Sequence, residues 1–383
     1  MNAKVKKIIP QLITLAVVIL IFGFFTYNAQ INMDNRGIEF GYGFLKQESS
    51  FDVQFSLIEY DGSHSYARAY LVGLLNTLLV AFLGIIIATI LGVVVGIARL
   101  SPNYLIERSA AFYVEFFRNI PLLLQIFFWY FAALRALPLP QDSEAMLGVF
   151  YLTIKGFFMP RFIWENLDVL FYSIIAVIIS IIFIRNYAKK LQENQGKQLP
   201  VFSISIGLFI VLPLLTFLFA GVSLSFELPV LHQLSTTSFV YKGGLGIPPE
   251  LIALTLALAL YTATFIAECV RAGIQGISKG QKEAAASIGL TPNQVLKLVI
   301  MPQALRIIIP PTTNQYLNLT KNSSLAAAIA YPDLVLVFAG TALMQTGRAI
   351  EIVSITMLTY LSISLSISVL MNWYNKKIAI TEK

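Results

Sequence analysis

Apolar stretches long enough to cross a lipid bilayer recur eight times along the chain. A helix needs about 20 apolar residues to span a hydrocarbon core of about 30 Å. The eight stretches are Ile8–Thr26, Tyr70–Ile97, Ala111–Leu134, Val169–Ile184, Val201–Ala220, Leu251–Val270, Ile307–Val337 and Ile350–Trp373. The pattern predicts an all-α integral membrane protein with about eight transmembrane helices.

The seventh stretch differs from the others because polar residues fill its middle. Pro310 and Pro311 are followed there by several Asn, Gln, Thr and Lys residues. Polar groups inside the hydrocarbon region must meet protein or water. We therefore expect that this stretch does not form an unbroken helix facing lipid.

Most segments between the predicted spans are polar. Residues 27–67 carry too many charges to enter lipid, and 189–197 form a short polar turn. The exception follows the turn signal Pro138-Leu139-Pro140 and is the mostly apolar stretch Met146–Met159, whose 14 residues are too few to span. It predicts an interfacial or re-entrant helix.

Composition and charge agree with a membrane protein. Apolar residues make up 57% of the chain and charged residues 12%, against roughly 45–50% and 25% in soluble domains. This excludes a soluble globule and a disordered chain, and the single cysteine, Cys269, excludes a disulfide scaffold.

The distribution of Lys and Arg predicts the orientation. With a cytoplasmic N-terminus, 17 of them fall on the cytoplasmic side, 8 outside and 2 within spans, so both termini are expected in the cytoplasm. Lys4, Lys6 and Lys7 before the first stretch also suggest a signal peptide. However, the mostly apolar run of 19 residues that follows exceeds a typical signal-peptide core, and Asn28-Ala29-Gln30 is a poor cleavage site, so we expect an uncleaved anchor.

Two short helices are predicted between the sixth and seventh spans. Ser278 with Gln281 has the spacing of a capping box, and Gly289 suits the position after the helix that begins there. Thr291 with Gln294 repeats the capping-box spacing, and Pro292 suits the first helical position.

The first of these helices is too short to be stable alone in water and therefore needs a partner surface. A connector on the membrane surface is the plain alternative. A DNA-binding helix-turn-helix is excluded, because the second helix, Val295–Met301, offers almost nothing that reads base edges.

This region resembles the coupling-helix signature of permease subunits of ATP-binding-cassette importers. The shared pattern is Glu283-Ala284-Ala285, three residues, Gly289, nine residues and Val299-Ile300-Met301-Pro302. The family prefers Ile and Leu where Val299 and Met301 stand. The resemblance implies that the helix Lys279–Ile288 sits in a groove of a separate ATPase, with coupling residues Glu283, Ala284, Ala285, Gly289 and Pro302.

Three more segments are similar to polar amino-acid permeases, and in particular to the general L-amino-acid permease type with an enlarged middle. They are Tyr113–Gln125, Tyr261–Glu268 and Asn314–Ser324. The resemblance implies a type I permease core of five helices, with one helix before it and two inside an insertion. The expected domains are an anchor helix and periplasmic loop at 1–69, a permease domain at 70–374 with the insertion at about 135–247, and a cytoplasmic tail at 375–383.

The resemblance also implies partners and a location. These are a dimer of ATPase subunits, a second permease chain or another copy of this one, an extracytoplasmic amino-acid-binding protein and an L-amino-acid substrate, but no nucleic acid. The location is the bacterial inner membrane. The chain is thus expected to form the translocation path of an ATP-driven importer of polar L-amino acids.

Charges near the membrane are predicted to pair locally. Glu115 and Arg118 are three residues apart on one helix, and Glu268 and Arg271 repeat this spacing. Because residues three apart are neighbours on a helix surface, we expect two structural ion pairs.

A polar stripe is the candidate translocation path. Asn314, Asn318, Lys321 and Asn322 fall on one side of the seventh stretch. Such a lining suits a solute with amino and carboxyl groups, although interhelical hydrogen bonds explain any single residue equally well. The Lys321 ammonium has two candidate partners, a substrate carboxylate and an acidic side chain of the protein, and the second is favoured because mobile cargo is poorly served by a strong fixed charge.

No catalytic residue, cofactor or metal site is expected. His64 and His232 lie in outside loops, and no His, Cys or carboxylate spacing suggests a metal. There is no phosphate-binding glycine loop of the Walker type, so ATP should bind elsewhere. The alternative function is an ion-coupled secondary amino-acid transporter using Glu115, Glu268 or Lys321, although no inverted repeat supports it. A membrane scaffold without transport leaves the polar stripe unexplained.

Overall fold

The computed structural model describes residues 3–35, 41–219, 223–235 and 238–378. Within them, seven helices are long and apolar enough to cross a membrane, and a bent helix pair makes eight. This confirms the predicted membrane protein with about eight spans. Residues 36–40 of the predicted loop, Ala220 of the fifth stretch and residues 379–383 of the predicted tail lie outside the described part.

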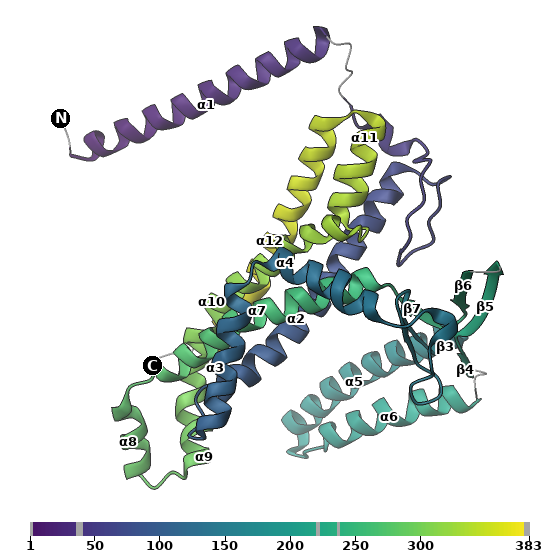
Figure 1. The fold of residues 1–383 in the computed structure, drawn as a ribbon. Coiled ribbons are helices and arrows are strands. Elements are labelled where there is room, and N and C mark those ends of the chain that lie inside the picture. The colour runs from purple at the N-terminus through teal and green to yellow at the C-terminus, as the bar shows by residue number, and fades with distance from the viewer. Residues whose placement is uncertain (1–2, 36–40, 220–222, 236–237, 379–383) are drawn as a thin grey trace. The chain divides into compact units, whose positions relative to one another are not determined.

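The chain forms two compact units (Figure 1). The first contains residues 1–129 and 253–383, and the second contains residues 130–252. The second unit has boundaries close to those of the predicted insertion at about 135–247. Whether it is an insertion relative to the family remains a prediction.

The first unit is helical. Its main elements are α1 (Ala3–Asn35), η1 (Tyr42–Lys46), α2 (Tyr66–Ala98), α3 (Tyr104–Asn119), α4 (Leu122–Phe127), α7 (Pro249–Gln275), α8 (Lys279–Ser287), α9 (Pro292–Gln294), η5 (Val295–Ile300), α10 (Met301–Asn322), η6 (Ser323–Ile329), η7 (Val335–Ala342), α11 (Leu343–Thr346) and α12 (Ala349–Ile378). The helix α10 packs against α2 and α12, and η7 packs against α2. Figure 1 shows α8 and α9 at one end of this bundle and α11 at the other.

Glycines let α2 approach its neighbours closely. A Cβ at Gly92 would lie 2.6 Å from Cβ of Ile266, and one at Gly96 would lie 2.7 Å from Cβ of Val270. The same added Cβ atoms would lie 3.0 and 2.8 Å from the carbonyl oxygens of Ala263 and Ala267 on α7. Small residues drive such contacts in membranes, where helix association depends on van der Waals packing. The α2–α7 contact is therefore a backbone-to-backbone contact.

The third predicted span is bent rather than straight. The segments Tyr104–Asn119 and Leu122–Ala136 meet at 102°. Pro121 has no N–H, and Ile120 before it is extended, with φ −95° and ψ 128°. Nε2 of Gln125 donates to the carbonyl oxygens of Phe117 and Ile120 at 2.7 and 2.9 Å. The side chain thus satisfies carbonyls that the bend leaves without helical partners.

The seventh stretch divides into two elements. The helix α10 runs through Pro310 and Pro311, continues as η6 and ends where Ala330 takes a left-handed conformation (φ 60°). A separate short apolar helix, Val335–Thr346, follows. The predicted span Ile307–Val337 therefore joined the end of one helix to the start of another.

The second unit combines a helical hairpin with small antiparallel sheets. Its helices are α5 (Leu167–Gln195) and α6 (Val201–Phe219), which pack together, and its short turns are η2 (Phe128–Ala133, which starts in the first unit), η3 (Leu134–Ala136) and η4 (Pro140–Asp142). Its strands are β1 (Tyr151–Thr153), β2 (Gly156–Met159), β3 (Arg161–Glu165), β4 (Ser223–Glu227), β5 (Val230–Ser235), β6 (Ser238–Lys242) and β7 (Leu245–Ile247). They form the sheets β1-β2-β7, β3-β4 and β5-β6.

The helix predicted at Met146–Met159 was wrong. This stretch forms the β1-β2 hairpin, with Tyr151 opposite Phe158 and Thr153 opposite Gly156. Gly156 has φ +127°, and a Cβ there would lie 2.2 Å from the carbonyl oxygen of Ile247. Only glycine fits this approach of β2 to β7, so the local backbone is held as strand.

We predict that Gly92→Ala destabilises the protein by about 1–3 kcal/mol, because the added methyl overpacks the α2–α7 contact. The thermal unfolding midpoint of the purified protein in detergent measures this effect. Gly207→Ala in α6 is the matched control, since nothing lies within 4 Å of its Cβ position. A midpoint for Gly92→Ala equal to that of the control would contradict the close contact.

Candidate functional site

The helix α8 ends in a Schellman motif. Gly289 takes φ +83°, its N–H donates to the carbonyl of Ala286 at 2.9 Å, and the N–H of Leu290 donates to the carbonyl of Ala285 at 3.3 Å. These two bonds satisfy carbonyls that have no partner within the helix. Nothing lies within 4 Å of a Cβ at Gly289, so glycine is favoured there by backbone conformation and not by space.

The two predicted capping boxes have different outcomes. At α9, the N–H of Thr291 donates to Oε1 of Gln294 at 2.9 Å, and the capping box is present. At α8, the helix begins at Lys279 as expected, but the side chain of Ser278 makes no capping hydrogen bond. The box predicted for Ser278 and Gln281 was therefore wrong.

The helix α8 exposes most of its surface. Ala285 is its one buried residue and is 5% exposed, while Glu283 and Ala284 are exposed. Beyond the helix, Pro302 is half-buried near the start of α10, and the side chain of Ile288 is 77% exposed. The inner side of α8 packs on η5. Its outer side is thus available to another molecule.

A charge cluster joins the ends of α2 and α7. Glu268 forms ion pairs with Arg271 on its own helix and with Arg99 at the end of α2. Nε of Arg271 donates to Oε2 of Glu268 at 3.1 Å, and Nη1 donates to Oε1 of Gln275 at 2.5 Å. The chain continues from this cluster into α8. The predicted contact of Glu268 with Arg271 is present, and the sequence did not indicate Arg99 as the third member.

The other predicted ion pair was wrong. The guanidinium of Arg118 lies over the ring of Phe265, 5.4 Å from its centroid. Among the ion pairs of the described residues none contains Glu115. A cation–π contact across two helices has replaced the expected contact along one helix, because aromatic rings of α7 lie within reach of α3.

The polar stripe on α10 points away from the packed core of this chain. Asn314, Asn318 and Lys321 are exposed and Asn322 is half-buried. The buried side of the same helix carries Ala304, Ile308, Ile309, Thr312, Leu319 and Thr320. Within the described residues, the side chains of the four stripe residues have no hydrogen bond or ion pair. The structure thus offers Lys321 no acidic partner in this part of the chain.

A buried polar network between α2 and the segment before η7 was missed by the sequence analysis. Nδ2 of Asn76 donates to the carbonyl oxygens of Phe55 and Pro332, both at 2.8 Å. The hydroxyl of Tyr331 donates to the carbonyl of Asn76 at 3.2 Å, and Oδ1 of Asp333 accepts from the N–H of Leu336 at 2.8 Å. Single polar residues inside otherwise apolar stretches were the available signal.

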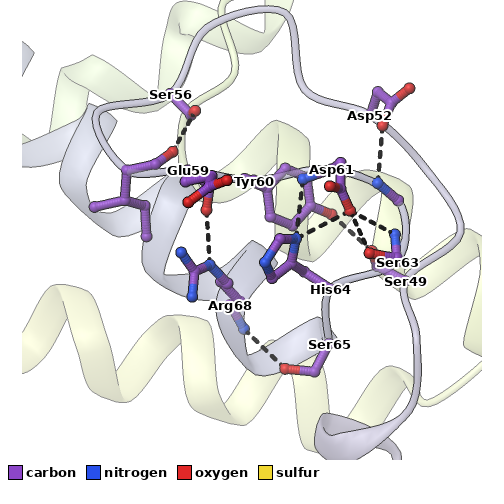
Figure 2. Close-up of polar contacts among 12 residues, drawn as sticks. Ser49, Asp52, Ser56, Glu59, Tyr60, Asp61, Ser63, His64, Ser65 and Arg68 are labelled. Atoms are coloured by element: carbon purple, nitrogen blue, oxygen red, sulfur yellow. Dashed lines mark hydrogen bonds and ion pairs between the residues drawn. The ribbon is translucent and has the colours of Figure 1, made fainter.

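The loop before α2 is folded against the bundle. The ring of Phe44 is buried and lies 6.0 Å from that of Tyr66 and 6.5 Å from that of Phe338, measured between centroids. Further along the same loop, Figure 2 shows hydrogen bonds of polar side chains with one another and with the backbone. Oδ1 of Asp61 accepts from the N–H of Ser63 at 2.9 Å, and Nε of Arg68 donates to the carbonyl of Glu59 at 2.7 Å. Hydrogen bonds from Ser63, first from its hydroxyl, lower the pKa of Asp61.

Comparisons with known proteins identify the family. Residues 198–380 match the family model described as "Binding-protein-dependent transport system inner membrane component". The putative amino-acid ABC transporter permease YhdX of Escherichia coli K12 is 45% identical over the whole of this chain and 96% of that protein. The chain belongs to the amino-acid ABC transporter permease family.

Two other relatives of this permease match its whole length. The general L-amino acid transport system permease AapQ of Rhizobium johnstonii is 46% identical and is covered over 94% of its length. The glutamate/glutamine/aspartate/asparagine transport system permease BztB of Rhodobacter capsulatus is 39% identical and is covered over 96%. The residues that match the family model include Glu268 and Arg271 on α7, the helix α8 and the stripe on α10.

A metal site is not formed by the described part of the permease, where no three His, Cys, Asp or Glu side chains come together.

We predict that Glu268→Gln destabilises the permease by about 2 kcal/mol, between the values for exposed and buried ion pairs. The change leaves two guanidinium groups beside a neutral amide, in a cluster whose side chains are 17–32% exposed. Thermal unfolding in detergent measures the loss. Glu283→Gln on α8 has no ion pair to lose among the described residues, and an equal midpoint for the two variants would exclude a stabilising role of the cluster.

Proposed function

We propose that this chain is the permease subunit of an ATP-driven importer of polar L-amino acids. The observation that carries the proposal is α8, a nine-residue helix that buries one residue and exposes most of the others. A helix of this length is marginal by itself in water and gains stability from a partner surface. The names of the full-length relatives support amino acids as the cargo.

The proposed partner of α8 is a separate ATPase subunit, present as a dimer. Closure of the ATPase moves α8, and the charge cluster passes this movement to α2 and α7, because Glu268 holds both helices at the end from which α8 starts. Alternating access then follows from two states of the bundle that the ATPase contacts differently. This subunit itself performs no chemistry.

The remaining parts of the importer follow from the same proposal. A second permease, homologous or identical, faces the stripe of Asn314, Asn318, Lys321 and Asn322, and the two chains line the path for the amino acid. An extracytoplasmic binding protein delivers the substrate at the end with the folded loop 41–65. The protein lies in the bacterial inner membrane with both termini in the cytoplasm, as the charge distribution favours. The permease domain is 70–374, with the insertion at about 135–247.

Reconstitution tests this function directly. Proteoliposomes containing the chain, its ATPase and the binding protein should take up polar amino acids only with ATP on the ATPase side, and an uncoupler should have no effect. Uptake without the ATPase that stops when an uncoupler is added would instead show an ion-coupled secondary transporter.

We predict that Glu283→Cys, in a Cys269→Ser background and carrying a benzophenone maleimide, forms a photo-cross-link to the ATPase. Leu57→Cys is the matched control, because Leu57 lies in the folded loop and is 49% exposed. It should not cross-link to the ATPase but should react with a membrane-impermeant maleimide added outside intact cells. Labelling of position 283 from outside would contradict both the orientation and the docking.

We predict that Gly289→Val reduces transport at least tenfold, whereas Gly289→Asn preserves most of it. A β-branched residue is disfavoured at φ +83°, while Asn tolerates the left-handed region. Uptake is measured together with membrane abundance, so that uncoupling is separated from poor insertion. Equal uptake by the two variants at equal abundance would show that α8 does not need this turn.

We predict that Lys321→Met weakens uptake several-fold while complex yield and basal ATP hydrolysis stay normal, since Lys321 has no acidic partner among the described residues. Lys321→Arg keeps the charge and serves as the control. Should another subunit supply a buried carboxylate, the complex would instead lose roughly 3–5 kcal/mol and fall apart, which would assign Lys321 to assembly.

A further inference from the structure

An apolar groove runs along the first unit between α2 and α12. Its volume is about 660 Å³, and its walls include Leu78 and Phe82 from α2 and Leu358 and Leu370 from α12. Ser362 and Ser366 lie on the α12 side of the groove and are exposed. Neither the charge cluster nor the polar stripe on α10 contributes to it.

The floor of the groove suits another helix. Ser362 and Ser366 are four residues apart, and their hydroxyls donate to the carbonyls of Leu358 and Ser362 on their own helix at 2.7 and 2.8 Å. Both donors are therefore satisfied without water, and both side chains are small. At the start of the groove, the hydroxyls of Tyr70 and Thr359 lie 2.8 Å apart and join α2 to α12. Small side chains of this kind let a second helix approach closely in a membrane.

The chain that follows the C-terminal end of α1 is bonded to a residue beside this groove. The backbone N–H of Gly41 donates to Oε1 of Glu351 at 2.9 Å, and Glu351 lies one helical turn before Ile355, which lines the groove. Asn35, the last residue of α1, is six residues before Gly41, so the chain between them reaches about 20 Å at most. The end of α1 is thus held near the mouth of the groove.

The helix α1 is apolar and long enough to fill the whole groove. Its candidate span Ile9–Asn32 has 24 residues and is about 36 Å long at 1.5 Å per residue. No residue in the most apolar part of this span is buried. The groove extends along α12 from Ile355 to Leu370, or about 22 Å. Ala16 and Gly23 are seven residues apart and therefore lie on the same side of α1, where nothing is within 4 Å of a Cβ at Gly23.

We infer that α1 docks into the groove between α2 and α12 of its own chain, antiparallel to both helices, with Ala16 and Gly23 against Ser362 and Ser366. The tether favours α1 over a helix of another chain, because the short connection to Gly41 holds the end of α1 near the mouth of the groove. In this position α1 shields the α2–α12 side from lipid and leaves the stripe on α10 free for the path.

Disulfide scanning tests the docking on the full-length chain in membranes. In a Cys269→Ser background, single cysteines at positions 14–25 are paired with Ser362→Cys or Ser366→Cys, and a protease site between α1 and Gly41 allows detection after cleavage. We expect cross-linking to recur every three or four residues, with maxima that include 16 and 23. Val18 and Phe25, on the opposite side of α1, should be minima.

Two controls make the result decisive. Met357→Cys on α12 is 68% exposed and does not line the groove, so it should not cross-link with Gly23→Cys. Co-expression of two differently tagged chains, one with Gly23→Cys and one with Ser362→Cys, should give no joined product. A flat profile along α1 would show that lipid fills the groove, and a product joining both tags would show that another copy fills it; either result overturns the inference.

Discussion

Close contact between α2 and α7 is the constraint on which the rest of the bundle depends. Gly92 and Gly96 bring the backbone of α2 to the surface of α7 near the end where α8 begins. Because lipid tails are as apolar as the helices, burying apolar surface alone does not hold two helices together in a membrane. The glycine contact supplies van der Waals packing. The ion pairs of Glu268 with Arg99 and Arg271 add an electrostatic attraction between α2 and α7 at the same end. The position of α8 relative to the spans follows from this joint.

Backbone polar groups explain the irregular parts of the fold. Where Pro121 bends the third span, the side-chain amide of Gln125 donates hydrogen bonds to the carbonyl oxygens of Phe117 and Ile120. Where the chain turns between η6 and η7, Asn76 bridges the carbonyls of Phe55 and Pro332, and so joins the loop before α2 to the bundle. Unpaired polar groups are costly in a hydrocarbon environment, and at both of these irregularities a side-chain amide donates to carbonyl oxygens of the backbone.

The two candidate surfaces share one property: each leaves polar or small side chains exposed. The helix α8 buries only Ala285, and the side chains of the stripe on α10 have no polar partner among the described residues of this chain. Surfaces of this kind are stable only when another molecule covers them or water fills the space between. In the proposed importer complex, the ATPase covers α8 and the second permease covers the stripe.

Local signals in the sequence determined most of the spans, the glycine turn after α8 and the contact of Glu268 with Arg271, because each depends on residues close together along the chain. The Ile120-Pro121 pair was a local signal for the bend in the third span. The continuous apolar pattern around it nevertheless suggested a straight helix. Tertiary structure alone decided that Arg99 joins Glu268, that Arg118 turns to Phe265 and that residues 146–159 form a hairpin instead of a helix. These outcomes depend on groups distant in the sequence, since a guanidinium pairs with whichever carboxylate or ring the packing brings within reach, and Gly156 is held as strand by the carbonyl of Ile247.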